Sequence, residues 1–208
     1  MRSLSFALAL AAACAHAPAP ADPRAAAAAS DVVTEVQGDT LVRSFDLNHD
    51  GKPDDWKTFK LVADPAAPGK TVERLIKREL DTNFDGKPDV TTWYDEEGVK
   101  VREAFDLDFD GRVDVVDLYE KGVLVRKEVF HGASPRPDQV VYYEGGRKVR
   151  VERDTRGKGQ VDTWEYFEDG KLQRIGEDLD GDGIVDRWIR AKEESAEDAP
   201  AAEKKRVR

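Results

Sequence analysis

From Asp31 onward, short segments of alternating apolar and polar residues are separated by glycine turns or by acidic clusters. The segments Thr91–Tyr94, Val113–Tyr119 and Val140–Tyr143 are rich in β-branched and aromatic side chains, which favour strands. Each is too short for an amphipathic helix, which needs about ten residues or more with a period of about 3.6. The pattern therefore predicts an all-β fold in which pairs of strands form hairpins.

The hairpins belong to a sequence repeat. Asp106, Phe130, Asp154 and Asp178 begin successive units at intervals of 24 residues. Each unit runs from a loop through a strand, an aromatic residue, a turn glycine and a second strand. This repeat predicts an antiparallel meander of about a dozen strands, with tight turns along one edge and acidic loops along the other. The aromatic residues are Phe59, Tyr94, Tyr119, Tyr143 and Phe167; the turn glycines are Gly98, Gly122, Gly146 and Gly170; the basic residues that follow these glycines are Arg102, Arg126, Arg150 and Arg174.

Alternation along each strand assigns side chains to the two faces of the sheet. One face is expected to carry Trp56, Trp93, Val116, Leu118, Val140, Tyr142, Trp164, Tyr166 and Trp188, and the aromatic residues before the turns are expected on the other. Neither face is cleanly apolar, so we expect a single-layer sheet that gains stability from contacts between neighbouring repeats.

Four acidic loops join the hairpins. The stretch Asp106–Asp117 reads DLDFDGRVDVVD, with carboxylates at positions 1, 3, 5, 9 and 12 and Gly111 at position 6. Hard divalent cations bind about six to eight oxygens, and this spacing lets several side-chain oxygens converge while position 7 supplies a backbone carbonyl. Related loops begin at Asp46, Asp81 and Asp178, so the sequence predicts Ca2+ as the cofactor. The predicted ligands are Asp46, Asn48, Asp50, Lys52 and Asp54; Asp81, Asn83, Asp85, Lys87 and Asp89; Asp106, Asp108, Asp110, Arg112, Asp114 and Asp117; and Asp178, Asp180, Asp182, Ile184 and Asp186.

Two further loops have lost these ligands. The loop that begins at Asp154 carries Arg156 and Lys158 at positions 3 and 5, where the cationic side chains can replace a metal ion, and the unit from Phe130 retains only Asp138. We therefore expect hairpin stacking to hold the fold and Ca2+ to stiffen selected corners. An alternative is that these loops are plain turns, because Asp, Asn and Gly also form turns between strands.

Composition limits the interpretation further. Hydrophobic residues make up 39% of the chain and charged residues 37%, so a large apolar core is not expected. The net charge of −10 lies largely in the acidic loops, and no broad basic face is present, which predicts that nucleic acid is not a partner.

The N-terminal residues have the pattern of an export signal. Met1-Arg2 is followed by an apolar run to Ala13, which is shorter than the roughly 20 residues of a transmembrane helix. Small residues before Cys14 resemble the lipobox of bacterial lipoproteins. The resemblance implies a signal peptide over residues 1–13, lipid such as palmitate on Cys14, and membrane anchoring in the bacterial cell envelope, at the outer membrane or in the periplasm. The alternative is an ordinary secretory signal that is cut later in the alanine stretch.

The remaining segments flank the repeat domain, residues 31–190. Residues 14–30 form an Ala/Pro-rich tether, and residues 191–208 form a charged tail that we expect to be disordered. Because Cys14 is the single cysteine, disulfides cannot stabilise the repeat domain, and bound metal is the remaining candidate for that role.

The loops of the form D-x-[DN]-x-D-G-x-[PV]-D resemble the calcium loops of thrombospondin type 3 repeats and their bacterial relatives, most closely at residues 51–54 and 86–89. Their ligand spacing is EF-hand-like, but Pro53 and Pro88 at position 8 argue against paired EF-hands. The hairpins between the loops are similar to MORN-type repeats. Neither resemblance implies catalysis.

These observations predict a non-enzymatic, calcium-binding envelope lipoprotein with a structural, adhesive or partner-binding role, its partner being another envelope protein or a glycan. The alternative is a carbohydrate-binding surface module that uses Trp56, Trp93, Trp164 and Trp188. An enzyme is disfavoured because the three histidines, His16, His49 and His131, form no Ser-His-Asp pattern or zinc spacing, and no phosphate-binding loop is visible.

Overall fold

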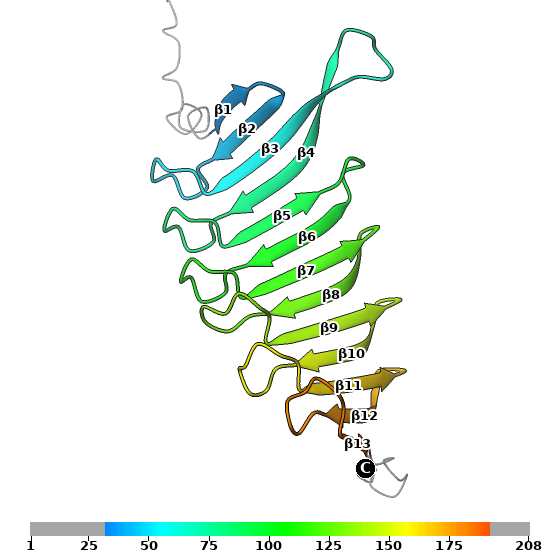
Figure 1. The fold of residues 1–208 in the computed structure, drawn as a ribbon. Coiled ribbons are helices and arrows are strands. Elements are labelled where there is room, and N and C mark those ends of the chain that lie inside the picture. The colour runs from blue at the N-terminus through cyan, green and yellow to red at the C-terminus, as the bar shows by residue number, and fades with distance from the viewer. Residues whose placement is uncertain (1–31, 192–208) are drawn as a thin grey trace, which may run out of the picture. The chain divides into compact units, whose positions relative to one another are not determined.

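The computed structural model describes residues 32–191, which form one antiparallel sheet of 13 strands (Figure 1). The predicted signal peptide, the lipidation site Cys14, the tether and residues 192–208 of the tail lie outside the described residues. Each strand pairs with the next one along the chain, and the sheet is open, with β1 and β13 at its edges. The predicted all-β antiparallel meander is therefore confirmed. The strands are β1 (Val32–Gln37), β2 (Thr40–Phe45), β3 (Asp55–Ala63), β4 (Thr71–Leu80), β5 (Val90–Tyr94), β6 (Lys100–Phe105), β7 (Val115–Glu120), β8 (Val123–Val129), β9 (Gln139–Glu144), β10 (Arg147–Arg153), β11 (Thr163–Glu168), β12 (Lys171–Glu177) and β13 (Arg187–Arg190).

Two-residue turns close the hairpins β7–β8, β9–β10 and β11–β12 at one end of the strands, whereas the longer segment 64–70 joins β3 to β4. The turn between β9 and β10 has Gly145 and Gly146 at φ 54° and 76°, and the turns 121–122 and 169–170 also have two residues with positive φ. Two successive residues of this kind make a type I′ turn, whose twist matches that of the paired strands. The predicted turn glycines Gly122, Gly146 and Gly170 occupy the second position, where glycine avoids the steric cost of a side chain.

A β-bulge recurs in the second strand of five hairpins. In β6, for example, Arg102 pairs with Trp93 but Lys100 pairs with Tyr94, so Val101 is the extra residue. The same register shift occurs between β3 and β4, β7 and β8, β9 and β10, and β11 and β12. A bulge increases local twist and places the next side chain on a defined face. The basic residues after the turn glycines stand directly after the bulges.

Strand register places the side chains as the alternation predicts. Cross-strand partners run without interruption from Trp56 through Val116, Val140 and Trp164 to Trp188, so these residues share one face. The neighbouring row of the same face alternates arginine with aromatic or aliphatic side chains. In that row the guanidinium carbon of Arg102 lies 4.4 Å from the centre of the Trp93 ring.

Buried apolar residues are few and lie on both faces. Among residues 32–191, the buried aspartates outnumber the buried apolar side chains, and most of these aspartates lie in the loops. In the described residues, the buried aspartates thus lie mainly where loops meet strands, while the middle of each acidic loop is exposed. The buried apolar residues are Leu41, Ala104, Val116, Val140, Val141 and Val151; the buried aspartates are Asp54, Asp55, Asp81, Asp89, Asp106, Asp117, Asp162 and Asp178.

Candidate metal centre

The acidic loops lie side by side along one end of the strands (Figure 1). Backbone hydrogen bonds join each loop to the next: Asp81 N–H donates to the carbonyl of Asp54 at 2.8 Å, and Asp106 N–H donates to that of Asp89 at 2.8 Å. The series continues through the loops that begin at Phe130, Asp154 and Asp178. The loops therefore form a stack that follows the pairing of the strands.

The aspartate at position 9 holds the start of its own loop. Asp54 Oδ2 accepts hydrogen bonds from the N–H groups of Leu47 and Asn48 at 2.8 and 3.2 Å. The aspartates at position 9 of the other loops, Asp89, Asp114, Asp138, Asp162 and Asp186, also accept backbone N–H bonds from the first residues of their loops. This position was predicted to be a ligand, but its main contacts fix the backbone.

The aspartate at position 1 holds the middle of the loop. Asp81 Oδ1 and Oδ2 accept the N–H groups of Phe84 and Gly86, both at 2.6 Å. A bond from the glycine at position 6 recurs at Asp46, Asp106, Asp154 and Asp178. Gly86 has φ 90°, which a residue with a side chain rarely adopts, so the glycine is required at this corner.

Side chains at positions 3 and 5 form Asx turns. Asn48 Oδ1 accepts the N–H of Asp50 at 2.9 Å, and Asp50 Oδ1 accepts the N–H of Lys52 at 2.8 Å. The same pair of bonds is made by Asn83 and Asp85, by Asp108 and Asp110, and by Asp180 and Asp182. The residues at position 7, Lys52, Lys87, Arg112 and Ile184, thus donate their N–H groups to the carboxylate at position 5. These bonds use Oδ1, so Oδ2 of each carboxylate does not take part in the turn.

Two loops bring three carboxylate oxygens together. Asp106, Asp108 and Asp114 each offer one oxygen within 4.8 Å of the others, and so do Asp178, Asp180 and Asp182. Within residues 32–191, the loops that begin at Asp46 and Asp81 form no such group of three. The latter two loops have an asparagine at position 3, which supplies an oxygen but no charge. The two groups of three can hold a metal ion.

Asp106 differs from its counterparts in one oxygen. Its side chain is buried, with the residue 8% exposed, and Oδ1 has no hydrogen-bond partner in the described structure. The equivalent Oδ1 atoms of Asp46, Asp81, Asp154 and Asp178 each accept a backbone N–H. Phe109 has φ 64° and Phe84 has φ 65°, so the φ of the residue at position 4 does not distinguish the two loops. A buried anionic oxygen without a partner is costly, and a bound cation would supply the missing interaction.

Asp117, the predicted ligand at position 12, is engaged elsewhere. It is buried on β7, and its Oδ1 lies 2.7 Å from Lys127 Nζ on the neighbouring strand β8. The structure does not gather it with the oxygens of Asp106, Asp108 and Asp114, nor does it gather Asp110 with them. Sequence reasoning missed Lys127, because cross-strand pairing depends on a register that the bulges set.

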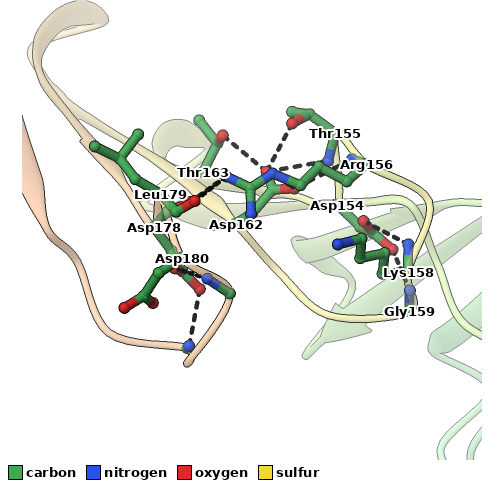
Figure 2. A network of polar contacts seen from close by, with 12 residues as sticks. Asp154, Thr155, Arg156, Lys158, Gly159, Asp162, Thr163, Asp178, Leu179 and Asp180 are labelled. Carbon is green, nitrogen blue, oxygen red and sulfur yellow. Dashed lines mark hydrogen bonds and ion pairs between the residues drawn. The ribbon is translucent and has the colours of Figure 1, made fainter.

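Loop 154–162 has a cationic side chain directed toward the next loop (Figure 2). Arg156 Nη2 donates to the backbone carbonyls of Asp178 and Leu179 at 2.6 and 3.2 Å, while Nε lies 3.8 Å from Asp162 Oδ2. The arginine thus bridges two loops instead of filling the centre of its own. A cavity of about 90 Å³ lies beside it, lined by Lys158 and Asp180 among others.

Arg156 also influences the neighbouring acidic group. Burial raises the pKa of Asp178, but hydrogen bonds from the N–H groups of Gly181 and Gly183, together with the positive charge of Arg156, outweigh burial and lower the pKa below its ordinary value. Asp178 therefore stays ionised, as a metal ligand must be.

The sequence contained a signal for the structural role of positions 1 and 9. Asp154 and Asp162 persist in a loop whose positions 3 and 5 are cationic, and Asp138 persists in a loop that has lost the other carboxylates. An aspartate that persists in a loop without the other ligand residues is expected to hold the backbone of that loop rather than a metal ion. Positions 3 and 5 vary because their side chains are exposed.

Comparisons with known proteins add little to this description. No protein-family model matches the chain, and no curated protein matches it. One chain in the crystal structure of GtfA/B complex aligns with a TM-score of 0.32 and 13% identity, over 76% of this chain and 20% of that chain. The present chain thus spans about a fifth of that protein, and the likeness is too weak to bear on fold or function. In residues 32–191 no helix is long and apolar enough to cross a membrane.

Proposed function

We propose that this chain is a calcium-binding repeat protein of the bacterial cell envelope, with a structural or partner-binding role rather than a catalytic one. Loops 106–114 and 178–186 are the proposed ion sites. The observation that carries the proposal is the buried Asp106 Oδ1, which has no hydrogen-bond partner and belongs to a group with Asp108 and Asp114. The envelope location rests on the lipobox-like sequence before Cys14.

The donor atoms favour calcium over other metals. Each group consists of carboxylate oxygens, without a histidine or cysteine, and hard cations such as Ca2+ and Mg2+ prefer oxygen. Mg2+ demands a near-octahedral arrangement and retains several waters, whereas Ca2+ accepts irregular sets of more oxygens. The spaced loop of Asp and Gly residues fits the second requirement.

An ion at these loops would act on the sheet through the loop stack. The backbone frame of each loop is complete without metal, as loop 154–162 demonstrates by its hydrogen bonds. Since Asp106 N–H bonds to the preceding loop and Asp114 C=O to the following one, a fixed loop 106–114 restrains both neighbours. Calcium is therefore expected to add stability to a sheet that already folds.

Heat denaturation with excess calcium or with chelator tests this proposal. One site occupied at about a hundredfold over its dissociation constant adds about 2.7 kcal/mol, so the midpoint of unfolding should rise with calcium. The double variant Asp108→Asn/Asp180→Asn keeps the Asx-turn oxygens but removes one charge from each group. It should unfold like the wild type in chelator and lose most of the calcium-dependent gain.

The control variant is Asp39→Asn, which removes an exposed aspartate in the β1–β2 turn, away from the loops. It should keep the full calcium response. Equal midpoints for the wild-type protein with calcium and with chelator would remove the calcium proposal. So would an unchanged calcium response in the double variant.

A further inference from the structure

A cavity without carboxylates lies at the junction of loop 106–114 and loop 130–138. Its volume is about 420 Å³, within the range of small-molecule sites. Arg102 of β6 and Arg112 of loop 106–114 supply positive charge to its lining. The lining also includes the apolar residues Val113, Val116, Phe130 and Pro135.

This cavity arises from an irregularity in the repeat. Loop 130–138 has Phe130, Gly132 and Ser134 where the other loops have Asp at position 1 and a polar or charged residue at positions 3 and 5. Arg112 therefore faces a loop that has no acidic side chain at those positions. At this junction Arg112 therefore lies beside the apolar residues Phe130 and Pro135 rather than beside acidic side chains.

Basic side chains at the next two loop junctions have partners in the following loop. Arg136 Nη1 donates to Gly159 O at 2.8 Å, and Arg156 Nη2 donates to Asp178 O at 2.6 Å. The Arg112 guanidinium makes no such bond into loop 130–138 within the described residues; its Nη1 lies 3.3 Å from Asp110 in its own loop. No carboxylate of residues 32–191 lies within ion-pair distance of Arg102, whose guanidinium stacks on Trp93.

A second cavity adjoins the first on the same face. It has a volume of about 240 Å³ and shares Arg102, Arg112 and Val113 with its neighbour. Trp93 lines this second cavity. The two cavities form an elongated depression with Arg102 and Arg112 between them. Its smaller end is lined by Trp93 but also by Asp89 and Asp106, so the lining without carboxylates is confined to the larger end.

We propose that this depression binds a saccharide that carries carboxylate groups. Guanidinium groups recognise carboxylates through charge-assisted hydrogen bonds, and an apolar or aromatic wall packs against the C–H face of a sugar ring. The absence of carboxylates from the lining of the larger cavity complements an anionic ligand. The elongated form favours two or more linked units over an isolated anion. No member of the metal groups lines the larger cavity, whereas Asp106 lines the smaller one, and saccharide binding in the larger cavity does not require calcium.

The sequence suggested glycan binding through four tryptophans. The structure narrows this idea to the surroundings of Trp93, because Trp56, Trp164 and Trp188 line neither cavity. Trp188 instead packs over Gly176, where a Cβ atom would come within 3.1 Å of the Trp188 ring.

Isothermal titration calorimetry of the full chain in chelator tests the proposal. The probe is tetragalacturonate, and its fully methyl-esterified form and free acetate serve as comparison ligands. We expect tetragalacturonate to bind with a millimolar or lower dissociation constant and the other two to bind at least tenfold more weakly. Chelator prevents calcium from bridging the acid to the loops, so failure here leaves the calcium proposal untouched.

Two variants test whether Arg102 and Arg112 bind the saccharide. Arg102→Gln and Arg112→Gln should each weaken binding of tetragalacturonate about tenfold. The matched control is Arg174→Gln, since Arg174 occupies the same row as Arg102 and stacks on Trp188 at 4.6 Å but lines neither cavity. It should bind like the wild type.

Several results would overturn the inference. These are no binding of tetragalacturonate, equal affinity for the methyl ester, equal affinity for acetate, or a loss in Arg174→Gln as large as that in Arg102→Gln. Arg112 lies in an exposed loop, so its variant keeps the proposal testable if Arg102→Gln does not fold.

Discussion

Loops 106–114 and 154–162 share a backbone and differ in charge. In both loops the aspartate at position 1 accepts the N–H of the glycine at position 6, and the aspartate at position 9 accepts N–H groups from the start of the loop. Loop 106–114 then has Asp108 and Asp110 at positions 3 and 5, where loop 154–162 has Arg156 and Lys158. The same backbone frame thus carries either anionic or cationic side chains at positions 3 and 5.

The difference extends to the buried oxygen of position 1. Asp154 Oδ1 accepts the N–H of Lys158 at 3.1 Å, whereas Asp106 Oδ1 has no partner. In loop 154–162 both carboxylate oxygens at position 1 thus accept backbone N–H groups, while loop 106–114 lacks one interaction that a cation can provide. The comparison teaches that positions 3 and 5 can change the charge of a loop while positions 1 and 9 keep its frame, and that in loop 106–114 the frame residues Asp106 and Asp114 also belong to the metal group.

Removing an aspartate that holds the backbone of a loop should have the largest effect on the free energy of unfolding. Asp162 is buried and accepts N–H groups of Thr155 and Arg156 as well as the Thr163 hydroxyl. Asp162→Ala leaves these donors without their charged partner and should lower the free energy of unfolding by about 3 kcal/mol. Urea denaturation measures this loss, which should be equal in calcium and in chelator because loop 154–162 holds no metal group.

The matched control is Glu168→Ala, at the exposed end of β11. It should change the free energy of unfolding by less than about 0.5 kcal/mol. A loss for Asp162→Ala that appears with calcium and disappears in chelator would show that frame and metal binding are not separable.

Converting the cationic loop should have the next largest effect. Arg156→Asp/Lys158→Asp gives loop 154–162 the ligand pattern of loop 106–114. Calorimetric titration should then detect one more calcium ion per chain than in the wild type, and saturating calcium at about a hundredfold over the dissociation constant should add about 2.7 kcal/mol. In chelator the variant should be less stable than the wild type, because Arg156 no longer bonds to Asp178 O and Leu179 O.

Arg156→Gln/Lys158→Gln separates the loss of positive charge from the gain of ligands. It removes both cations without adding a carboxylate, so its calcium stoichiometry should equal that of the wild type. An increase in this control as large as that in the aspartate variant would mean that positive charge alone had kept the ion out.

The sheet could be predicted from the sequence because its signals are local. Runs such as Val113–Tyr119 and Val140–Tyr143 are too short for helices. Gly122 and Gly146 adopt the positive φ that the hairpin turns require. The bulges could not be predicted, since Val101 looks like an ordinary strand residue in a list of apolar and polar positions. The basic residue after each turn glycine was visible, but its position in one cross-strand row emerges only when the bulge sets the register.

The candidate site could be predicted in part for a related reason. A spaced Asp pattern looks the same whether its oxygens cap backbone N–H groups or face a cation. Asp54 and Asp89 are predicted ligands, and in the structure both accept backbone N–H groups, while Asp89 also accepts the Thr82 hydroxyl. The two loops that gather three carboxylates are those with Asp at position 3, which the sequence shows. Which third carboxylate joins the group, Asp114 in one loop and Asp182 in the other, depends on side-chain orientation, and the missing partner of Asp106 Oδ1 depends on a single N–H; neither of these features has a sequence signature.

Protonation of an aspartate at position 1 should have the smallest effect on the free energy of unfolding. Burial raises the pKa of Asp154, but hydrogen bonds from the N–H groups of Lys158 and Gly159 outweigh it, and the pKa lies below the ordinary value of 3.8. A carboxyl group whose pKa is lowered by folding stabilises the protein above its unfolded pKa, and this contribution is lost as the pH falls through the folded pKa. Asp154→Asn should therefore be less stable than the wild type at pH 7, by about 1 kcal/mol.

The difference between the two proteins should narrow as the pH falls from about 3.8 toward the lower pKa of the folded state, since the carboxyl group is protonated first in the unfolded chain and then in the folded protein. Urea denaturation in chelator from pH 7 to pH 3 measures this, with Glu168→Gln as the exposed control whose difference from the wild type stays small throughout. A difference for Asp154→Asn that is constant over this range would show that the ionised carboxylate does not hold the loop. In that case the feature common to loops 106–114 and 154–162 would be the glycine corner alone, and the aspartate at position 1 would belong to the metal site rather than to the frame.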